Sequence, residues 1–205
     1  MKTIYLTFIL FLSLTAYGQN NYEKSMAEAM KSWKSGDIKD AISKFENIGK
    51  MDKDNWLPKY YQALLTASSS FSIQNVDDKS AIIEQAKKLI PSDSTKLNAE
   101  WYVVNALIYT SELTLDPQNK AIYIIPIIME QYQKALALEP ENPRVWLSLS
   151  EFQINSKKYS GGDTKEECKQ LEKALSLFEK EKHDTAFYPS WGKERTEQLI
   201  SSCKN

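Results

Sequence analysis

The sequence predicts an all-α fold in which helical hairpins stack one on another. Small residues recur along the chain at Ala29, Ala63, Ala106 and Ser150, at spacings of 34, 43 and 44 residues. Because a hairpin of two helices cannot bury its own apolar stripe, hairpins stack, and a small residue is needed wherever two helices approach closely. The composition agrees, since 26% of the residues are charged and the 205-residue chain has only 6 glycines and 7 prolines, as expected of an ordered helical protein.

The first eighteen residues have the pattern of a secretory signal peptide. Lys2 precedes a largely apolar run over 4–14, and small residues follow, so we expect cleavage between Gly18 and Gln19. The alternative, a membrane-spanning helix, would need ~20 apolar residues, which the run does not reach. No cysteine precedes Cys168, so none near the cut can carry a lipid anchor. We expect a mature protein without a transmembrane segment, in the periplasm or secreted.

The rest of the chain is expected to form one domain of about four hairpins and a C-terminal capping helix. The turn between the third and fourth hairpins shows how one hairpin ends and the next begins. Pro140 ends one helix, and Pro143 stands in the first turn of the next, where its missing N–H costs little. The approximate boundaries within the domain 19–205 are 22–55, 56–95, 96–142 and 143–182 for the hairpins and 190–203 for the capping helix.

Several short segments resemble tetratricopeptide repeats. They are EPENPR at 139–144, the spacing of Trp146, Leu149 and Ser150, and SGD at 35–37 before Ala41. The spacing of 34 residues is also the period of that family. More narrowly, the loop SGGDTKEE and the tail YPSWGKERTEQLISSC resemble a group of small exported proteins of the Bacteroidota. The resemblance implies a tetratricopeptide-like α–α superhelix, or solenoid, that binds other proteins.

In such a superhelix the first helix of each hairpin lines the concave face. The family's inward positions, carried over residue by residue, give an apolar groove of Met26, Met30, Trp33, Tyr60, Leu64, Val103, Leu107, Leu147, Glu151 and Ile154. One interpretation is that a peptide or a helix of a partner lies in this groove, with the methionines adapting to its shape. The other is that tight curvature brings these side chains together as additional core.

Two insertions break the period of 34 residues. The insertion at 68–80 is interpreted as a polar loop that ends in a helix cap. The other contains a nearly continuous apolar stretch at 121–129 around Pro126. Read as structure, Pro126 lies near the first turn of a helix and the isoleucines are core. Read as function, Ile122, Tyr123 and Ile125 form an exposed apolar patch that a partner or a membrane surface covers.

No catalytic site, metal site or cofactor is expected. His183 is the only histidine and lies in a linker, so we interpret it as a solvated loop residue. One histidine and two distant cysteines do not supply a tetrahedral metal site. The glycine turn at 161–163 lacks the strand and the lysine of a phosphate loop, so a helix cap is expected there. The tripeptides at 93–95 and 184–186 resemble the acceptor pattern for O-linked glycans in exported Bacteroidota proteins, although Asp-Ser is also a common cap.

The two cysteines are expected to form a disulfide. Cys168 lies about fourteen residues before the linker at 182, and Cys203 lies about thirteen residues after Ser190, where the terminal helix begins. In antiparallel helices with a rise of ~1.5 Å per residue, both cysteines are about 20 Å from the connecting turn and therefore level. An oxidising compartment preserves such a bond. The alternative is two reduced thiols in helix interfaces.

These observations predict an exported, non-catalytic interaction module that binds a peptide or a partner helix. A different class is a periplasmic accessory of a transport system that binds a small ligand or glycan, on which the aromatic residues Trp33, Tyr60, Trp101 and Tyr109 would stack. The formal net charge of −1 gives no broad attraction to nucleic acid or to an anionic membrane. An enzyme is not expected.

Overall fold

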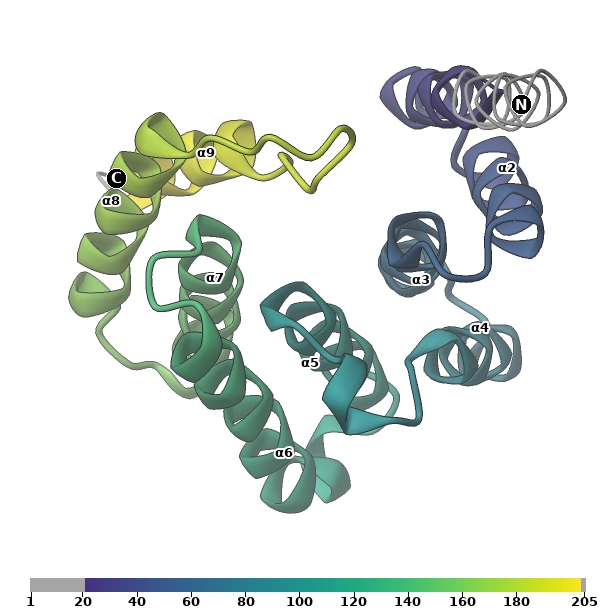
Figure 1. Ribbon diagram of the computed structural model, residues 1–205. Helices are drawn as coiled ribbons and strands as arrows, with labels where there is room; N and C mark the ends of the chain where they lie inside the picture. Colours follow the sequence, from purple (N-terminus) through teal and green to yellow (C-terminus); the bar gives the residue numbers. More distant parts are fainter. Residues whose placement is uncertain (1–20, 204–205) are drawn as a thin grey trace, which may run out of the picture. The chain divides into compact units, whose positions relative to one another are not determined.

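The computed structural model describes residues 21–203, and this part of the chain consists of helices and their connections, with no strand. Residues 21–34 lie in a helix, which is followed by α2 (Ile38–Met51), α3 (Trp56–Ser69), α4 (Val76–Leu89), α5 (Ala99–Leu113), α6 (Pro117–Leu138), α7 (Pro143–Ser160), α8 (Lys165–Lys180) and α9 (Lys193–Cys203) (Figure 1). Short 3₁₀ turns follow α3 (Ser70–Ser72) and precede α5 (Ser94–Lys96). The signal peptide and its cleavage between Gly18 and Gln19 fall outside the described residues.

The all-α prediction is confirmed, and each of the four ranges assigned to a hairpin contains two helices. The small residues that recur at Ala29, Ala63, Ala106 and Ser150 are all fully buried, as close helix packing requires. Whether the hairpins are tetratricopeptide repeats is a finer assignment, which stays a prediction. Within the described chain, no helix combines the length and the apolar character needed to cross a bilayer.

Side chains that accept hydrogen bonds from the first turn fix where the helices begin. Asp37 caps α2, Asn75 caps α4, Asn98 caps α5, Asp116 caps α6 and Asn142 caps α7. Each such cap satisfies an otherwise unpaired backbone N–H and stabilises its helix by about 1 kcal/mol. Prolines follow the caps of α6 and α7 directly, at the position where a helix tolerates them best.

The chain forms two compact units that divide within α3, between Leu65 and Thr66. The core of the first unit is aromatic. The ring centroid of Tyr61 lies 5.1 Å from that of Phe45 and 5.7 Å from that of Trp33. Pairs at such distances contribute about 0.5–1.5 kcal/mol beyond the area that they bury. Packed aromatic rings, one pair stacked and one tilted, therefore join α2, α3 and the preceding helix within this unit.

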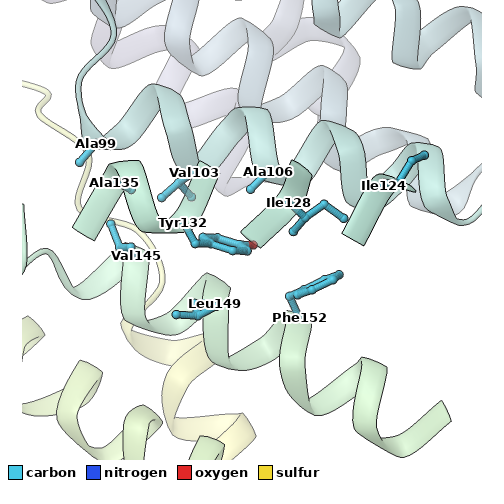
Figure 2. Packing of buried hydrophobic residues seen from close by; sticks show 10 residues of the cluster. All are labelled: Ala99, Val103, Ala106, Ile124, Ile128, Tyr132, Ala135, Val145, Leu149 and Phe152. Carbon is cyan, nitrogen blue, oxygen red and sulfur yellow. The ribbon is translucent and has the colours of Figure 1, made fainter. Parts of the chain in front are cut away.

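The second unit has two apolar clusters. In the first cluster, α5 packs along α6, and α7 closes the cluster from the other side (Figure 2). Its buried members are Ala99, Val103, Ala106, Ile124, Ile128, Tyr132, Ala135, Val145, Leu149 and Phe152. The second cluster joins α7, α8 and α9 through Leu147, Ile154, Leu171, Ala174, Phe178 and Leu199.

Helix α6 differs from its predicted form. We expected Pro126 near the first turn, but the helix begins at Pro117, and Pro126 lies in its interior. The stronger start signal is Asp116, whose side chain caps the helix, followed by a proline in the first turn. The pyrrolidine ring of Pro126 is exposed, so the missing N–H falls on the solvent side of a helix that tertiary packing holds.

Candidate functional site

The exposed side of α6 carries an apolar surface, formed by Ile122, Tyr123 and Pro126, which we name the α6 apolar face. The side chains of Ile122 and Tyr123 are 85% and 52% exposed, whereas Ile124 and Ile128 on the opposite side are buried in the first cluster. No charged residue occurs between Lys120 and Glu130. Exposed apolar groups gathered without charge are typical of binding surfaces.

The packing below holds this face in place. Ile125 is half-buried and packs against the first cluster, so of the three residues predicted as a patch only Ile122 and Tyr123 project from the surface. Lys120 turns away toward α5, where its Nζ lies 3.4 Å from the Glu112 carboxylate. Lys87 of α4 approaches the same carboxylate at 2.8 Å. One acid between two lysines thus joins α4, α5 and α6 beside the face.

The predicted groove residues of the first unit are mostly core. Met26, Tyr60 and Leu64 are buried, and Met30 and Trp33 are half-buried. Trp33 packs toward Tyr61, with 5.7 Å between the ring centroids. These positions fit the alternative in which the side chains meet one another rather than line an open surface.

The groove residues of the second unit are also drawn into packing. Val103 belongs to the first cluster, and Leu147 and Ile154 belong to the second. Leu107 is half-buried. Glu151 accepts hydrogen bonds from the guanidinium of Arg195 in α9. Of the other aromatic residues considered for ligand stacking, Trp101 is buried and Tyr109 packs against the first cluster.

A buried charged cluster, which no sequence pattern indicates, ties the ends of several helices together. Arg144 at the start of α7 and Glu100 at the start of α5 are both fully buried, and the Arg144 Nε lies 2.7 Å from the Glu100 Oε1. The amide of Asn142 donates to the same oxygen at 2.7 Å. The other two guanidinium nitrogens donate to Glu181, after α8, at 2.9 and 2.5 Å. The bidentate contact fixes the loop that follows α8.

His183 lies in an exposed loop, as expected, and also contacts this cluster. Its Nε2 lies 2.8 Å from Glu181, and its ring stacks on Tyr188 with 3.9 Å between the centroids. Burial by itself would raise the pKa of Glu181, but the hydrogen bonds and charge of Arg144, with those of His183, hold it below its usual value. Burial raises the pKa of Tyr188 to about 12, and the charges of Glu139 and Glu100 add to that effect. Each charge in the cluster thus has a structural partner.

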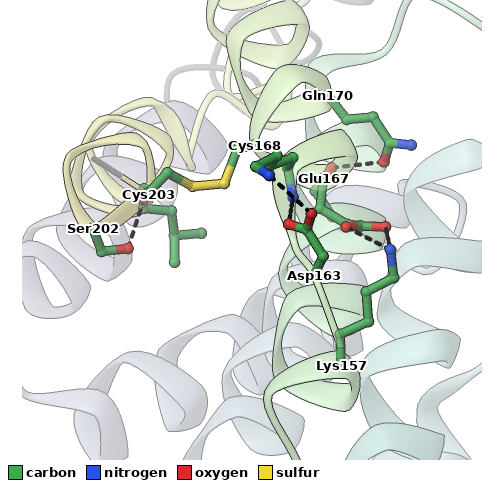
Figure 3. The surroundings of a disulfide bond; sticks show 10 residues. Lys157, Asp163, Glu167, Cys168, Gln170, Ser202 and Cys203 are labelled. Atoms are coloured by element: carbon green, nitrogen blue, oxygen red, sulfur yellow. Dashed lines mark hydrogen bonds and ion pairs between the residues drawn. A yellow bond between two sulfur atoms is a disulfide. The ribbon is translucent and has the colours of Figure 1, made fainter. Parts of the chain in front are cut away.

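The structure joins Cys168 and Cys203 in a disulfide, with 6.0 Å between their Cα atoms (Figure 3). Among the described residues, no group of three or more histidine, cysteine or acidic side chains could hold a metal ion.

At the glycine turn, Gly161 adopts a left-handed conformation and ends α7, and Asp163 accepts a hydrogen bond from the Lys165 N–H. Asp93 caps a 3₁₀ turn through the Thr95 N–H.

Comparison with known proteins gives one structural likeness. No protein-family model and no curated protein sequence matches the chain. Among solved structures, the chain is similar to the HusA haemophore from Porphyromonas gingivalis, with a TM-score of 0.69 and 19% sequence identity. The similarity covers 91% of this chain and 92% of that one. The two proteins therefore share a fold.

Proposed function

We propose that this chain is an exported, non-catalytic binding protein, an accessory of a transport system that carries a flat apolar ligand of the haem class. The observation that supports the proposal most directly is the similarity to a haemophore over 91% of the chain. A fold by itself hosts many functions. The proposal therefore also needs a surface with suitable chemistry.

The α6 apolar face is the surface that we assign to this ligand. A planar macrocycle binds chiefly by removing apolar area from water, and Ile122 and Tyr123 offer adjacent aliphatic and aromatic contacts without a competing charge. Full burial of a side chain such as Ile122 contributes about 2 kcal/mol. Because the buried residues of α6 anchor the helix, its exposed side is presented without a folding step.

Titration with haemin tests the proposal. Added haemin should quench the fluorescence of the protein's 5 tryptophans until one ligand is bound per chain. Binding should also shift the absorbance spectrum of haemin. Replacing Ile122 by Glu should weaken binding at least about tenfold, equivalent to ~1.4 kcal/mol, because a charge then lies under the ligand. The same substitution at Leu138, which is 54% exposed at the far end of α6, should leave binding unchanged.

The two parts of the proposal can fail separately. If the unaltered protein does not bind haemin, the haem-class function is wrong. If it binds haemin and Ile122→Glu binds equally well, the function stands and the α6 apolar face is not the site. Circular dichroism of both variants checks that the helices remain formed.

A protein-interaction module is the second candidate, because the same exposed pair, Ile122 and Tyr123, could anchor a partner polypeptide. For this second candidate we propose that the hairpins are tetratricopeptide-like repeats. The assignment is supported by the presence of two helices in each range expected for a repeat. Capture of one defined polypeptide from a periplasmic extract by the unaltered protein and by Leu138→Glu, but not by Ile122→Glu, would favour this candidate.

A further inference from the structure

A single cation lies at the edge of the α6 apolar face. Between Asp116 and Glu130, Lys120 is the only charged residue in the sequence. It precedes Tyr123 by three positions, and side chains three apart on a helix are neighbours. The Lys120 side chain is 25% exposed. The charge next to the apolar face is therefore positive and accessible to solvent.

Lys120 is the most weakly held member of the ion cluster beside the face. The Nζ of Lys87 lies 2.8 Å from both the Glu84 and the Glu112 carboxylates. The Nζ of Lys120 lies 3.4 Å from the other oxygen of Glu112. Burial by itself would raise the pKa of Glu112, but the hydrogen bond and charge of Lys87, followed by those of Lys120, hold it below its usual value. Lys87 is therefore the main cationic partner of Glu112.

This arrangement lets Lys120 turn to another carboxylate at little cost. Breaking a partly buried ion pair is costly when one charge is left without a partner. Glu112 keeps the shorter contact with Lys87 if Lys120 moves away. An ammonium group also has three N–H donors, so Lys120 can bind a second carboxylate while it stays near the first.

The opposite end of the face begins with a negative charge. Glu130 is exposed and pairs with Lys134 at 2.7 Å. The uncharged stretch from Lys120 to Glu130 spans ten residues, or about 15 Å of helix. A flat ligand with acidic groups along one edge is therefore attracted by that edge to the Lys120 end and repelled at the Glu130 end.

We propose that Lys120 binds the carboxylates of the ligand, and that the ligand is a tetrapyrrole with free carboxylates along one edge. This inference rests on the haem-class function proposed above. In the bound form, the Lys120 ammonium donates to a ligand carboxylate while the macrocycle covers Ile122 and Tyr123. Lys120 thus selects acidic tetrapyrroles over neutral apolar molecules of the same shape.

Titration with haemin and with haemin dimethyl ester, which lacks both carboxylate charges, tests the inference. The unaltered mature protein should bind haemin about fivefold more tightly than the ester, the size of effect that a partly exposed ion pair produces. Lys120→Gln should weaken haemin binding about fivefold and leave binding of the ester unchanged, so that the preference disappears. Lys134→Gln is the matched control, because it removes a cation of the same helix beside Glu130, and it should keep the preference.

The inference and the proposed function fail in different ways. If the unaltered protein binds neither haemin nor the ester, the haem-class function is wrong, and the role of Lys120 falls with it. If both ligands bind and Lys120→Gln keeps the preference for haemin, the function stands and the inference is wrong. Equal weakening of haemin and ester by Lys120→Gln would also overturn it, because Lys120 would then act through the structure of α6. Circular dichroism of the variants checks that the helices remain formed.

Discussion

At the scale of single residues, Arg144 stands out in the second unit because its buried charge depends on two acidic partners. It is fully buried together with Glu100, and it also binds Glu181 in a bidentate contact. Buried ion pairs are not efficient sources of stability, because desolvation opposes their attraction, but removing one partner leaves the other charge stranded. The cost of losing Arg144 should therefore far exceed the cost of losing an exposed arginine.

The substitution Arg144→Met measures this difference. We expect it to lower the free energy of unfolding by about 3–5 kcal/mol, because the Glu100 carboxylate is left buried without its cation. Arg195→Met is the matched control, since it removes the partly exposed pair with Glu151 and should cost ~1 kcal/mol or less. Denaturant unfolding of both variants provides the comparison. Equal losses would contradict the assigned importance of the buried cluster.

At the scale of elements, α6 shows that tertiary packing can hold a helix together despite a proline in its interior. Pro126 lies in the helix interior, where it removes one hydrogen bond and its ring crowds the preceding turn. The helix persists because Ile124, Ile128 and Tyr132 are buried against α5 and α7. Because Pro126 is exposed, replacing it removes little buried apolar surface.

Replacing Pro126 by alanine should therefore stabilise the protein. We expect a gain of about 1–3 kcal/mol, because the N–H returns and alanine has the highest helix propensity. Thermal unfolding followed by circular dichroism would show a rise in Tm of several degrees. A lower Tm would mean that the proline fits a bend on which the packing of α6 depends.

At the scale of the whole molecule, the sequence predicts the elements better than the surfaces. Helix boundaries were predictable because Pro140, Pro143 and the turn at 161–163 act on their own neighbours. The level placement of Cys168 and Cys203 follows from the rise of two helices, and the structure has the bond. The charged cluster was not predictable, because Arg144 meets Glu100 and Glu181 across 44 and 37 residues with no periodic pattern.

The residues predicted to line the groove are buried or half-buried for a related reason. Positions such as Leu147 and Ile154 were assigned from the first helix of one hairpin, but their exposure depends on what packs against that helix. Leu199 of α9 joins the same cluster. By contrast, Ile122 and Tyr123 on α6 are exposed, in an insertion that departs from the repeat period. Sequence spacing alone does not indicate which of two apolar faces remains uncovered.

The proposed function is to carry a flat apolar ligand of the haem class. Native mass spectrometry of the mature protein, purified from the envelope of the cells that make it, tests this claim most directly. We expect a mass that exceeds that of the mature chain by one tetrapyrrole. The excess mass should be lost in the Ile122→Glu variant and retained in the Leu138→Glu variant. A ligand-free chain bound to a partner polypeptide would contradict it and favour the interaction module.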